Sequence, residues 1–226
     1  MPSSLADPQL RALLEDLHAR SDAQAPGAGD YFRSRAEAGR TDFSGFDAGD
    51  HAYFADKLVA LDRDKAQFCY ELCRATGARR IVECGASFGV STLYLAAAVR
   101  DNGGGIVVTT EHEPAKAAAA RANYAAAGLA DLIDLREGDL RQTLQDLEGP
   151  IDFVLFDIWT EMVRPAVGLI APHLRDGSVL CADNTAGPRG RSAYADYFAF
   201  VEDPANGLRT LTLPFDGGLE MTVRSG

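Results

Sequence analysis

Apolar residues follow a regular alternation along the chain from residue 80 onward. Short apolar runs rich in β-branched side chains, which predict strands, alternate with longer stretches whose apolar positions recur at helical spacing. The run Phe153-Val154-Leu155-Phe156 is apolar at every position, which is typical of a strand covered by helices on both faces. The predicted strands are residues 80–84, 105–111, 132–137, 152–157 and 178–182, and the predicted helices are residues 90–100, 114–127, 140–147 and 161–174.

This alternation predicts an α/β fold with a doubly wound, mostly parallel sheet, because right-handed crossovers return each strand to the same sheet. The C-terminal part differs, since two strand patterns, residues 208–213 and 219–223, flank the turn-forming run Phe215-Asp216-Gly217-Gly218. The expected fold is therefore a Rossmann-like α/β sheet with a C-terminal antiparallel hairpin and an N-terminal helical extension.

The N-terminal part carries a weaker pattern. A helix is predicted over residues 7–20, and residues 21–50 form a loose stretch rich in Ala, Gly, Asp and Ser. A longer helix is predicted over residues 52–76. We expect residues 1–50 to form an N-terminal helix and a flexible arm, and residues 51–226 to form the main domain.

Aromatic rings in this polar stretch have two interpretations. Tyr31, Phe32, Phe43 and Phe46 make the stretch too apolar for a pure linker. Either the arm is a lid or a partner contact whose rings cover a pocket, or the rings only hold a loop against the core.

The chain of 226 residues has a formal net charge of -11. Nucleic acids and anionic membranes both attract basic surfaces, so neither partner is expected. No apolar run reaches membrane-spanning length and the N-terminus lacks a signal-peptide pattern, which predicts a cytoplasmic protein. Cys69, Cys73, Cys84 and Cys181 lie inside predicted regular elements, and we expect buried free thiols rather than a zinc site.

A short glycine-containing loop follows the first predicted strand. Glu83 lies near the end of that strand, and Gly85 and Gly89 come before the next helix. Glycine lets the backbone approach a ligand closely, and strand–loop–helix units of this kind bind nucleosides at the carboxyl end of the strand. The two glycines lack the third glycine of the dinucleotide fingerprint, so the loop predicts an adenosine ligand without a pyrophosphate.

Acidic residues close or follow the predicted strands. Ligands bind at the carboxyl ends of parallel strands, so these side chains are candidates for binding. Glu111 is placed to accept hydrogen bonds from two ribose hydroxyls, with capping of the next helix as the alternative. Asp139 is placed to accept from an adenine amino group, with N-capping as the alternative. The acids at or near strand ends are Glu83, Glu111, Asp139, Asp157 and Asp183.

Five segments combine into a recognisable set. They are residues 81–92, Thr110-Glu111-His112-Glu113-Pro114, Phe156-Asp157-Ile158-Trp159, Cys181-Ala182-Asp183-Asn184 and Asp216-Gly217-Gly218-Leu219. In this order they resemble the motifs of the class I S-adenosylmethionine-dependent methyltransferases, and especially of the catechol and caffeoyl-CoA type O-methyltransferases. The resemblance begins near residue 61 and leaves the N-terminal arm uncovered.

The resemblance implies S-adenosyl-L-methionine as the cofactor and a small-molecule acceptor that is aromatic or a vicinal diol. Glu111 would bind the ribose, while Asp139 and Trp159 would border the adenine, with packing in the core as the alternative for Trp159. The residues that would surround the methionine moiety are Glu83, Gly85, Ser87, Gly89 and Ser91, with Asp157 lining the same pocket. Because the family often forms dimers, a homodimer is expected.

Asp157, Asp183 and Asn184 would form a metal site. Two carboxylates and an amide carbonyl are oxygen donors that suit Mg²⁺, which would bind the acceptor's paired hydroxyls and acidify one of them. The alternative is that Asp157 lines the cofactor pocket while Asp183 and Asn184 only organise the next loop.

One position departs from the metal-dependent branch. A lysine usually acts there as the general base, whereas Thr160 occupies the position here and cannot accept a proton near neutral pH. Three alternatives stay open: the metal alone acidifies the hydroxyl enough, His51 or Glu161 serves as the base, or the enzyme acts by proximity on an already good nucleophile. Asp157 and His51 are therefore the candidate catalytic residues.

The chain is thus expected to be a methyltransferase that acts on a small-molecule hydroxyl with the help of a divalent metal. The alternatives are a metal-independent O- or N-methyltransferase and a non-catalytic cofactor-binding regulatory or partner protein.

Overall fold

The computed structural model describes residues 3–41, 45–186 and 190–226, and within them the strands form one mixed sheet. The strands are β1 Arg80–Cys84, β2 Ile106–Glu111, β3 Ile133–Glu137, β4 Ile151–Phe156, β5 Leu174–Asp183, β6 Leu208–Leu213 and β7 Leu219–Arg224. Their order is β3-β2-β1-β4-β5-β7-β6. β1 to β5 are parallel, and β7 pairs antiparallel with β5 and with β6.

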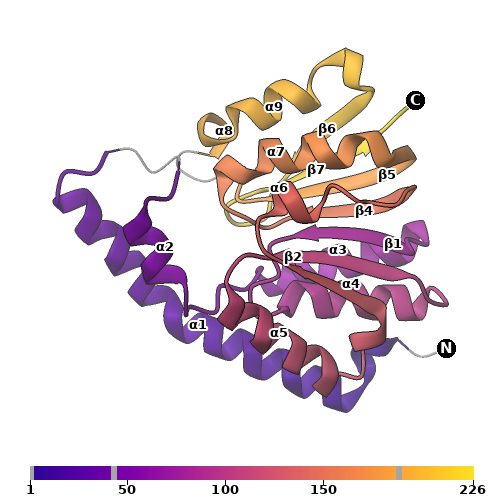
Figure 1. Ribbon diagram of the computed structural model, residues 1–226, viewed down its shortest axis with the longest axis horizontal. Coiled ribbons are helices and arrows are strands. Elements are labelled where there is room, and N and C mark those ends of the chain that lie inside the picture. The colour runs from indigo at the N-terminus through magenta and orange to yellow at the C-terminus, as the bar shows by residue number, and fades with distance from the viewer. Residues whose placement is uncertain (1–2, 42–44, 187–189) are drawn as a thin grey trace.

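Helices cover both faces of this sheet (Figure 1). They are α1 Pro8–Glu37, α2 Ala48–Phe54, α3 Arg63–Thr76, α4 Val90–Asp101, α5 Pro114–Ala126, α6 Leu140–Thr143, α7 Thr160–Ile170, α8 Gly190–Ala193 and α9 Ala195–Val201. The first half of α1 packs with α3, α4 and α5 on one face, and α6, α7 and α9 cover the other. Phe153 and Leu155 of β4 point into the first core and Val154 and Phe156 into the second, so this strand is buried on both faces as its sequence predicts.

The expected fold class is confirmed. β1 and β6 have the predicted bounds, and the C-terminal strands form the expected antiparallel hairpin. β5 begins earlier than predicted, at Leu174, and α6 is shorter, ending at Thr143. These differences lie at element ends and leave the carboxyl edge of the parallel strands in the predicted place.

α1 is longer than the sequence pattern indicates. It continues to Glu37, so the prediction of a loose stretch from residue 21 is wrong for residues 21–37. Gly27, Gly29 and an internal Pro26 lower the helix propensity of this half. Tertiary contacts compensate, because Tyr31 stacks on Tyr53 of α2 with ring centroids 3.9 Å apart.

The helix predicted over residues 52–76 is two helices. α2 ends at Phe54 and α3 begins at Arg63, so the chain changes direction between them. We refer to residues 21–37 of α1 together with residues 45–54 as the N-terminal arm. Figure 1 shows this arm standing beyond the end of the sheet, at the left of the view. Phe43, one of the aromatic residues noted in the sequence, lies outside the described residues.

Two simpler expectations can be compared with the structure. Cys69, Cys73, Cys84 and Cys181 are buried and free, as predicted. Among the residues that the structure describes, no helix combines the length and the apolar character needed to cross a membrane.

Candidate functional site

The candidate site lies at the carboxyl ends of β1, β2 and β4, where the strand order reverses. β1 pairs with β2 on one side and with β4 on the other, and the chain leaves these strands toward opposite faces of the sheet. A cavity of about 720 Å³ opens at this point, which is within the usual range for a ligand pocket. The predicted site residues that line it are His51, Gly85, Ser87, Glu111, Asp139, Asp157, Trp159 and Asn184.

The loop after β1 requires its two glycines for different reasons. Gly85 has a φ of +96°, and a Cβ there would overlap the carbonyl oxygen of Asp157 and lie 2.6 Å from Cγ2 of Ile158. Gly89 has a φ of +84°, and a Cβ there would overlap the Tyr124 ring. Gly85 therefore lets β1 and β4 approach at the cavity, whereas Gly89 lets α4 pack against α5. Of the two, Gly85 lines the cavity.

Glu111 is held at the cavity wall by backbone groups. The Ser87 N–H donates to Oε2 at 2.7 Å, and the Glu113 N–H donates to Oε1 at 2.8 Å. Burial raises the pKa of Glu111, while the two backbone donors and the nearby Lys116 ammonium oppose that effect. Each carboxylate oxygen keeps a further lone pair, so Glu111 is oriented to accept two hydrogen bonds from a vicinal diol such as ribose.

Glu83 lies beneath the loop rather than on the cavity wall. Its side chain is fully buried and accepts hydrogen bonds from the hydroxyls of Thr92 and Thr109, the latter at 2.6 Å. Burial raises the pKa of Glu83, with Ser91 and the two threonine hydroxyls opposing the shift. In this structure Glu83, Gly89 and Ser91 fix the shape of the loop and do not line the cavity.

At the predicted adenine end, the structure places Asp139 both at the cavity and at the start of α6. It lines the cavity, and its side chain also caps α6 by accepting from the Arg141 N–H at 2.9 Å. The hydrogen bonds of Arg141 lower the pKa of Asp139. Trp159 lines the cavity as well, but the arm covers one face of its ring, because Phe46 stacks on it with centroids 3.6 Å apart.

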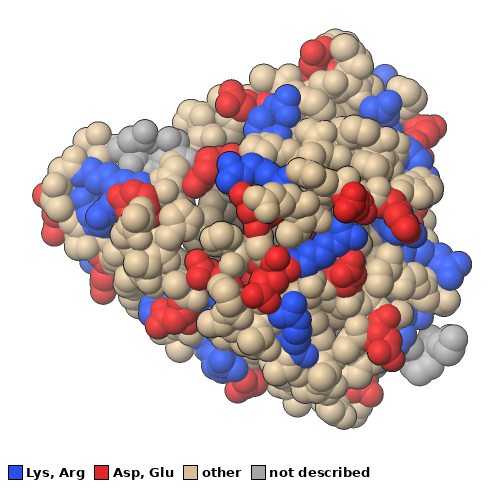
Figure 2. Space-filling model, viewed as in Figure 1, with Lys and Arg blue, Asp and Glu red and all other residues tan. Residues whose placement is uncertain are grey.

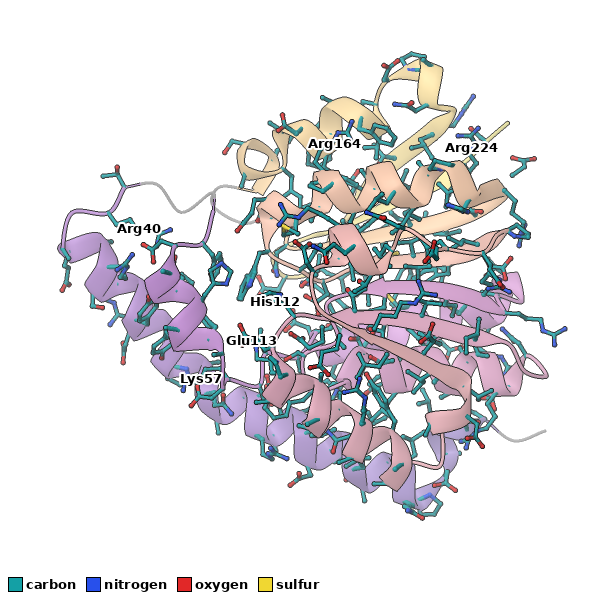
Figure 3. The ribbon with its side chains drawn as sticks, in the orientation of Figure 1. Arg40, Lys57, His112, Glu113, Arg164 and Arg224 are labelled. Atoms are coloured by element: carbon teal, nitrogen blue, oxygen red, sulfur yellow. The ribbon has the colours of Figure 1, made fainter. Side chains whose placement is uncertain are left out.

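The N-terminal arm forms the outer wall of the cavity. Phe32, Phe46 and Phe54 line it together with His51, and the Phe46 N–H donates to the Glu161 side chain at 3.2 Å. Figure 3 shows His112 and Glu113, which follow β2, facing the side of the molecule where Arg40 and Lys57 lie. Acidic side chains gather around the recess between the arm and the sheet domain (Figure 2). The wall is therefore aromatic within and acidic around its mouth.

Asp50 holds the arm together. This buried carboxylate accepts from the Tyr31 hydroxyl at 2.9 Å, from the Asp47 N–H at 2.9 Å and from the Arg40 guanidinium. Burial alone would raise the pKa of Asp50, but these hydrogen bonds outweigh burial and hold that pKa below its usual value.

Replacing Asp50 by asparagine is expected to loosen the arm and expose Trp159 to water. Trp159 is the only tryptophan of the chain, so its fluorescence reports the Phe46 stack. We expect emission at longer wavelength and stronger quenching by acrylamide. A carboxylate with a lowered pKa stabilises the closed arm above the pKa of the free side chain, about 3.9, and loses that effect as the pH falls through the lower folded value. Wild-type emission should therefore approach that of the variant only below about pH 4.

The matched control for Asp50 is Asp16→Asn, which removes an exposed carboxylate of α1 that pairs with Arg20 at 3.5 Å. That variant should keep wild-type emission. Unchanged emission in Asp50→Asn at neutral pH would contradict the role given to Asp50.

A lysine that sequence reasoning missed occupies the predicted metal site. Lys65, in the first turn of α3, is fully buried, and its Nζ donates to Oδ1 of Asp183 at 2.7 Å and lies 3.1 Å from Oδ2 of Asp62. Burial lowers the pKa of Lys65, but Asp183 and Asp62 outweigh it and raise that pKa, so Lys65 remains an ammonium group. Burial and the neighbouring Asp183 raise the pKa of Asp157 well above its usual value.

In this structure, groups of the chain itself engage the residues expected to bind magnesium. Both oxygens of Asp183 are engaged, Oδ1 by Lys65 and Oδ2 by the Asn184 amide nitrogen at 2.8 Å. The Asn184 amide oxygen lies beside Gly217. It is 2.7 Å from the point that a Cβ would occupy if residue 217 were not a glycine. Asp183 itself does not line the cavity.

Three further cavity residues were not predicted as ligands. His112 and Lys116 line the wall next to Glu111, and burial lowers the pKa of Lys116. Tyr194 also lines the cavity, and its hydroxyl donates to the carbonyl oxygen of Asp183 at 2.8 Å. The helical spacing of Tyr194, Tyr197 and Phe198 indicates core packing, and all three are buried. His112 was visible in the sequence as the residue after Glu111.

Comparison with known proteins finds methyltransferases. A family model described as a methyltransferase domain matches residues 82–185. The chain is 33% identical over 139 residues to a catechol O-methyltransferase of Mycobacterium tuberculosis, covering 61% of this chain and 62% of that protein. The chain thus spans less than two thirds of the length of the curated relatives that it matches.

Solved structures agree in fold. An O-methyltransferase from Bacillus cereus in complex with SAH has a TM-score of 0.67 at 26% identity, over 74% of this chain and 83% of that one. The O-methyltransferase TomG from Streptomyces achromogenes, in complex with SAM, has a TM-score of 0.66 at 25% identity, over 78% of this chain and 86% of that one. These comparisons support the resemblance to the class I S-adenosylmethionine-dependent methyltransferases, and to the branch that contains the catechol O-methyltransferases.

Proposed function

We propose that the protein transfers a methyl group from S-adenosyl-L-methionine to a hydroxyl of a small aromatic acceptor. The observation that carries the proposal is one continuous cavity that joins Gly85 and Glu111 at the sheet to Phe46 and Trp159 at the arm. The sheet side offers a close backbone approach and an oriented carboxylate, which suit an adenosine. The arm side offers rings, on which a planar acceptor would stack.

The charge of the cavity supports the same cofactor. When bound, S-adenosyl-L-methionine supplies a methyl group on a positively charged sulfonium, and transfer to the acceptor oxygen leaves the C–S electron pair on sulfur. Asp157 and Glu111 line the cavity and favour a cation there. The chain contributes mainly by holding the acceptor oxygen in line with the methyl carbon.

The acceptor hydroxyl must lose its proton during transfer. Asp157 lines the cavity, and its raised pKa brings it closer to that of an effective base. His51 lines the cavity from α2 and is the second candidate. We place both within reach of an acceptor held between the arm and the sheet.

The acceptor class rests on the aromatic wall and on the relatives. The curated relatives are named catechol O-methyltransferases, which matches an acceptor that is both aromatic and a vicinal diol. A homodimer stays a prediction from the resemblance, and a cytoplasmic location stays a prediction from the sequence pattern.

The test is calorimetric titration with S-adenosylhomocysteine, followed by turnover on a panel of catechols and monophenols in which the methylated product is quantified. We expect cofactor binding and methylation of at least one aromatic hydroxyl. Cofactor binding with no product from any acceptor would support the non-catalytic alternative. No cofactor binding would refute the proposal.

A further inference from the structure

Lys65 occupies the centre of the acidic cluster at the end of β5. Its Nζ donates a hydrogen bond to Asp183 and lies close to Asp62. It also lies near Gly217 in the β6–β7 turn, 3.8 Å from the point that a Cβ on that residue would occupy. The same Gly217 position is next to the Asn184 amide oxygen. The ammonium group therefore bonds directly to Asp183, one of the carboxylates that the resemblance assigned to a metal ion.

We infer that the Lys65 ammonium replaces a divalent cation in this protein, holding Asp183 and Asn184 in place so that methyl transfer proceeds without a metal. The inference rests on the proposed function for its link to methyl transfer, but the geometry of Lys65 stands independently of it. Lys65 does not line the cavity, so it acts through Asp183 as a positioning residue.

The hydrogen-bond directions support this replacement. A metal ion would require lone pairs of Asp183 and Asn184 to point at one centre. Here the Asn184 amide nitrogen donates to Asp183 Oδ2 while Lys65 takes Oδ1. Asp183 is thus satisfied by two donors from the chain itself.

Manganese binding tests the inference without relying on activity. Mn²⁺ prefers oxygen donors, and its electron paramagnetic resonance signal decreases when it binds to protein. The wild-type protein should bind Mn²⁺ no better than an Asp183→Asn variant. The Lys65→Met variant, which keeps side-chain length but loses the charge, should gain a site that binds Mn²⁺ at least roughly 10-fold more tightly than wild type.

Three further variants locate that site. Lys65→Arg retains the charge and should gain no Mn²⁺ binding. Lys116→Met removes another buried lysine near the cavity that has no contact with Asp183, and should also gain none. The double variant Lys65→Met with Asp183→Asn should lose the site again. A merely structural role for Lys65 predicts no such gain, so the gain separates positioning from general support of the fold.

Wild-type measurements keep the inference testable if Lys65→Met does not fold. Tight Mn²⁺ binding by the wild-type protein would overturn it, as would Mn²⁺ binding in Lys65→Met that survives the loss of Asp183. Turnover abolished by a chelator and restored by Mg²⁺ would also overturn it. Failure of S-adenosylhomocysteine to bind would instead refute the proposed function, and the two failures are therefore distinguishable.

Discussion

Replacing Glu111 by glutamine is expected to lower the affinity for S-adenosylhomocysteine by roughly 100-fold, because hydrogen bonds to a charged group contribute about 1.5–3 kcal/mol each. The substitution removes the charge and leaves one acceptor oxygen. It also turns an amide NH₂ toward one of the two backbone donors, the N–H of Ser87 or of Glu113, that hold the carboxylate. Isothermal titration calorimetry measures the change directly.

The control for Glu111 is Glu137→Gln at the end of β3. Glu137 is exposed and pairs with Arg121 at 2.9 Å, so its loss should leave cofactor affinity unchanged. Thermal unfolding of both variants shows whether the fold is intact. A Glu111→Gln protein that folds and binds within a factor of about three of wild type would contradict the ribose role, since that factor is only about 0.7 kcal/mol.

Replacing Gly85 by alanine is expected to destabilise the protein by about 3 kcal/mol or more. A left-handed backbone costs a non-glycine residue about 1–2 kcal/mol, and forcing atoms into a packed region costs about 1–3 kcal/mol. At Gly85 both apply, because φ is +96° and the new methyl group would overlap Asp157 and contact Ile158. Urea unfolding measures the loss as a lower midpoint.

Gly128→Ala separates the two causes. Gly128 also has a positive φ, +63°, but a Cβ there would meet no atom within 4 Å. The Gly128→Ala substitution should therefore cost only the free energy of a left-handed backbone at a non-glycine residue, about 1–2 kcal/mol. Equal destabilisation by the two substitutions would mean that the approach of β1 to β4 is not the reason for a glycine at residue 85.

The parts of the site carried by local sequence were predictable. Gly85 follows one buried strand and Glu111 is the last residue of the next, and the strand pattern places both at the same sheet edge. Two parallel strands that neighbour each other bring their carboxyl ends together, so spacing along the chain was enough. The Rossmann-like order and the final hairpin followed from the same alternation.

Contacts between distant segments were not predictable in this way. Lys65 and Asp183 are 118 positions apart, and a lysine early in a helix carries no signal that it is buried against a strand end. Phe46 and Glu161 are 115 positions apart, so the contact of the arm with the sheet domain could not be predicted from the sequence either. The second half of α1 has poor local propensity, and its helix exists because of the rings packed against α2.

α1 serves two parts of the molecule, and this limits how the protein can be shortened. Its first half contributes Leu10, Leu14 and Leu17, all at most 4% exposed, to the core beside α4. A deletion that ends at residue 50 would therefore strip the sheet domain of interior side chains as well as the outer wall of the cavity. If such a shortened protein lost activity, the loss of core packing would explain the result as well as the loss of the arm would. Single substitutions in the arm avoid this, because they leave the core side chains of α1 in place.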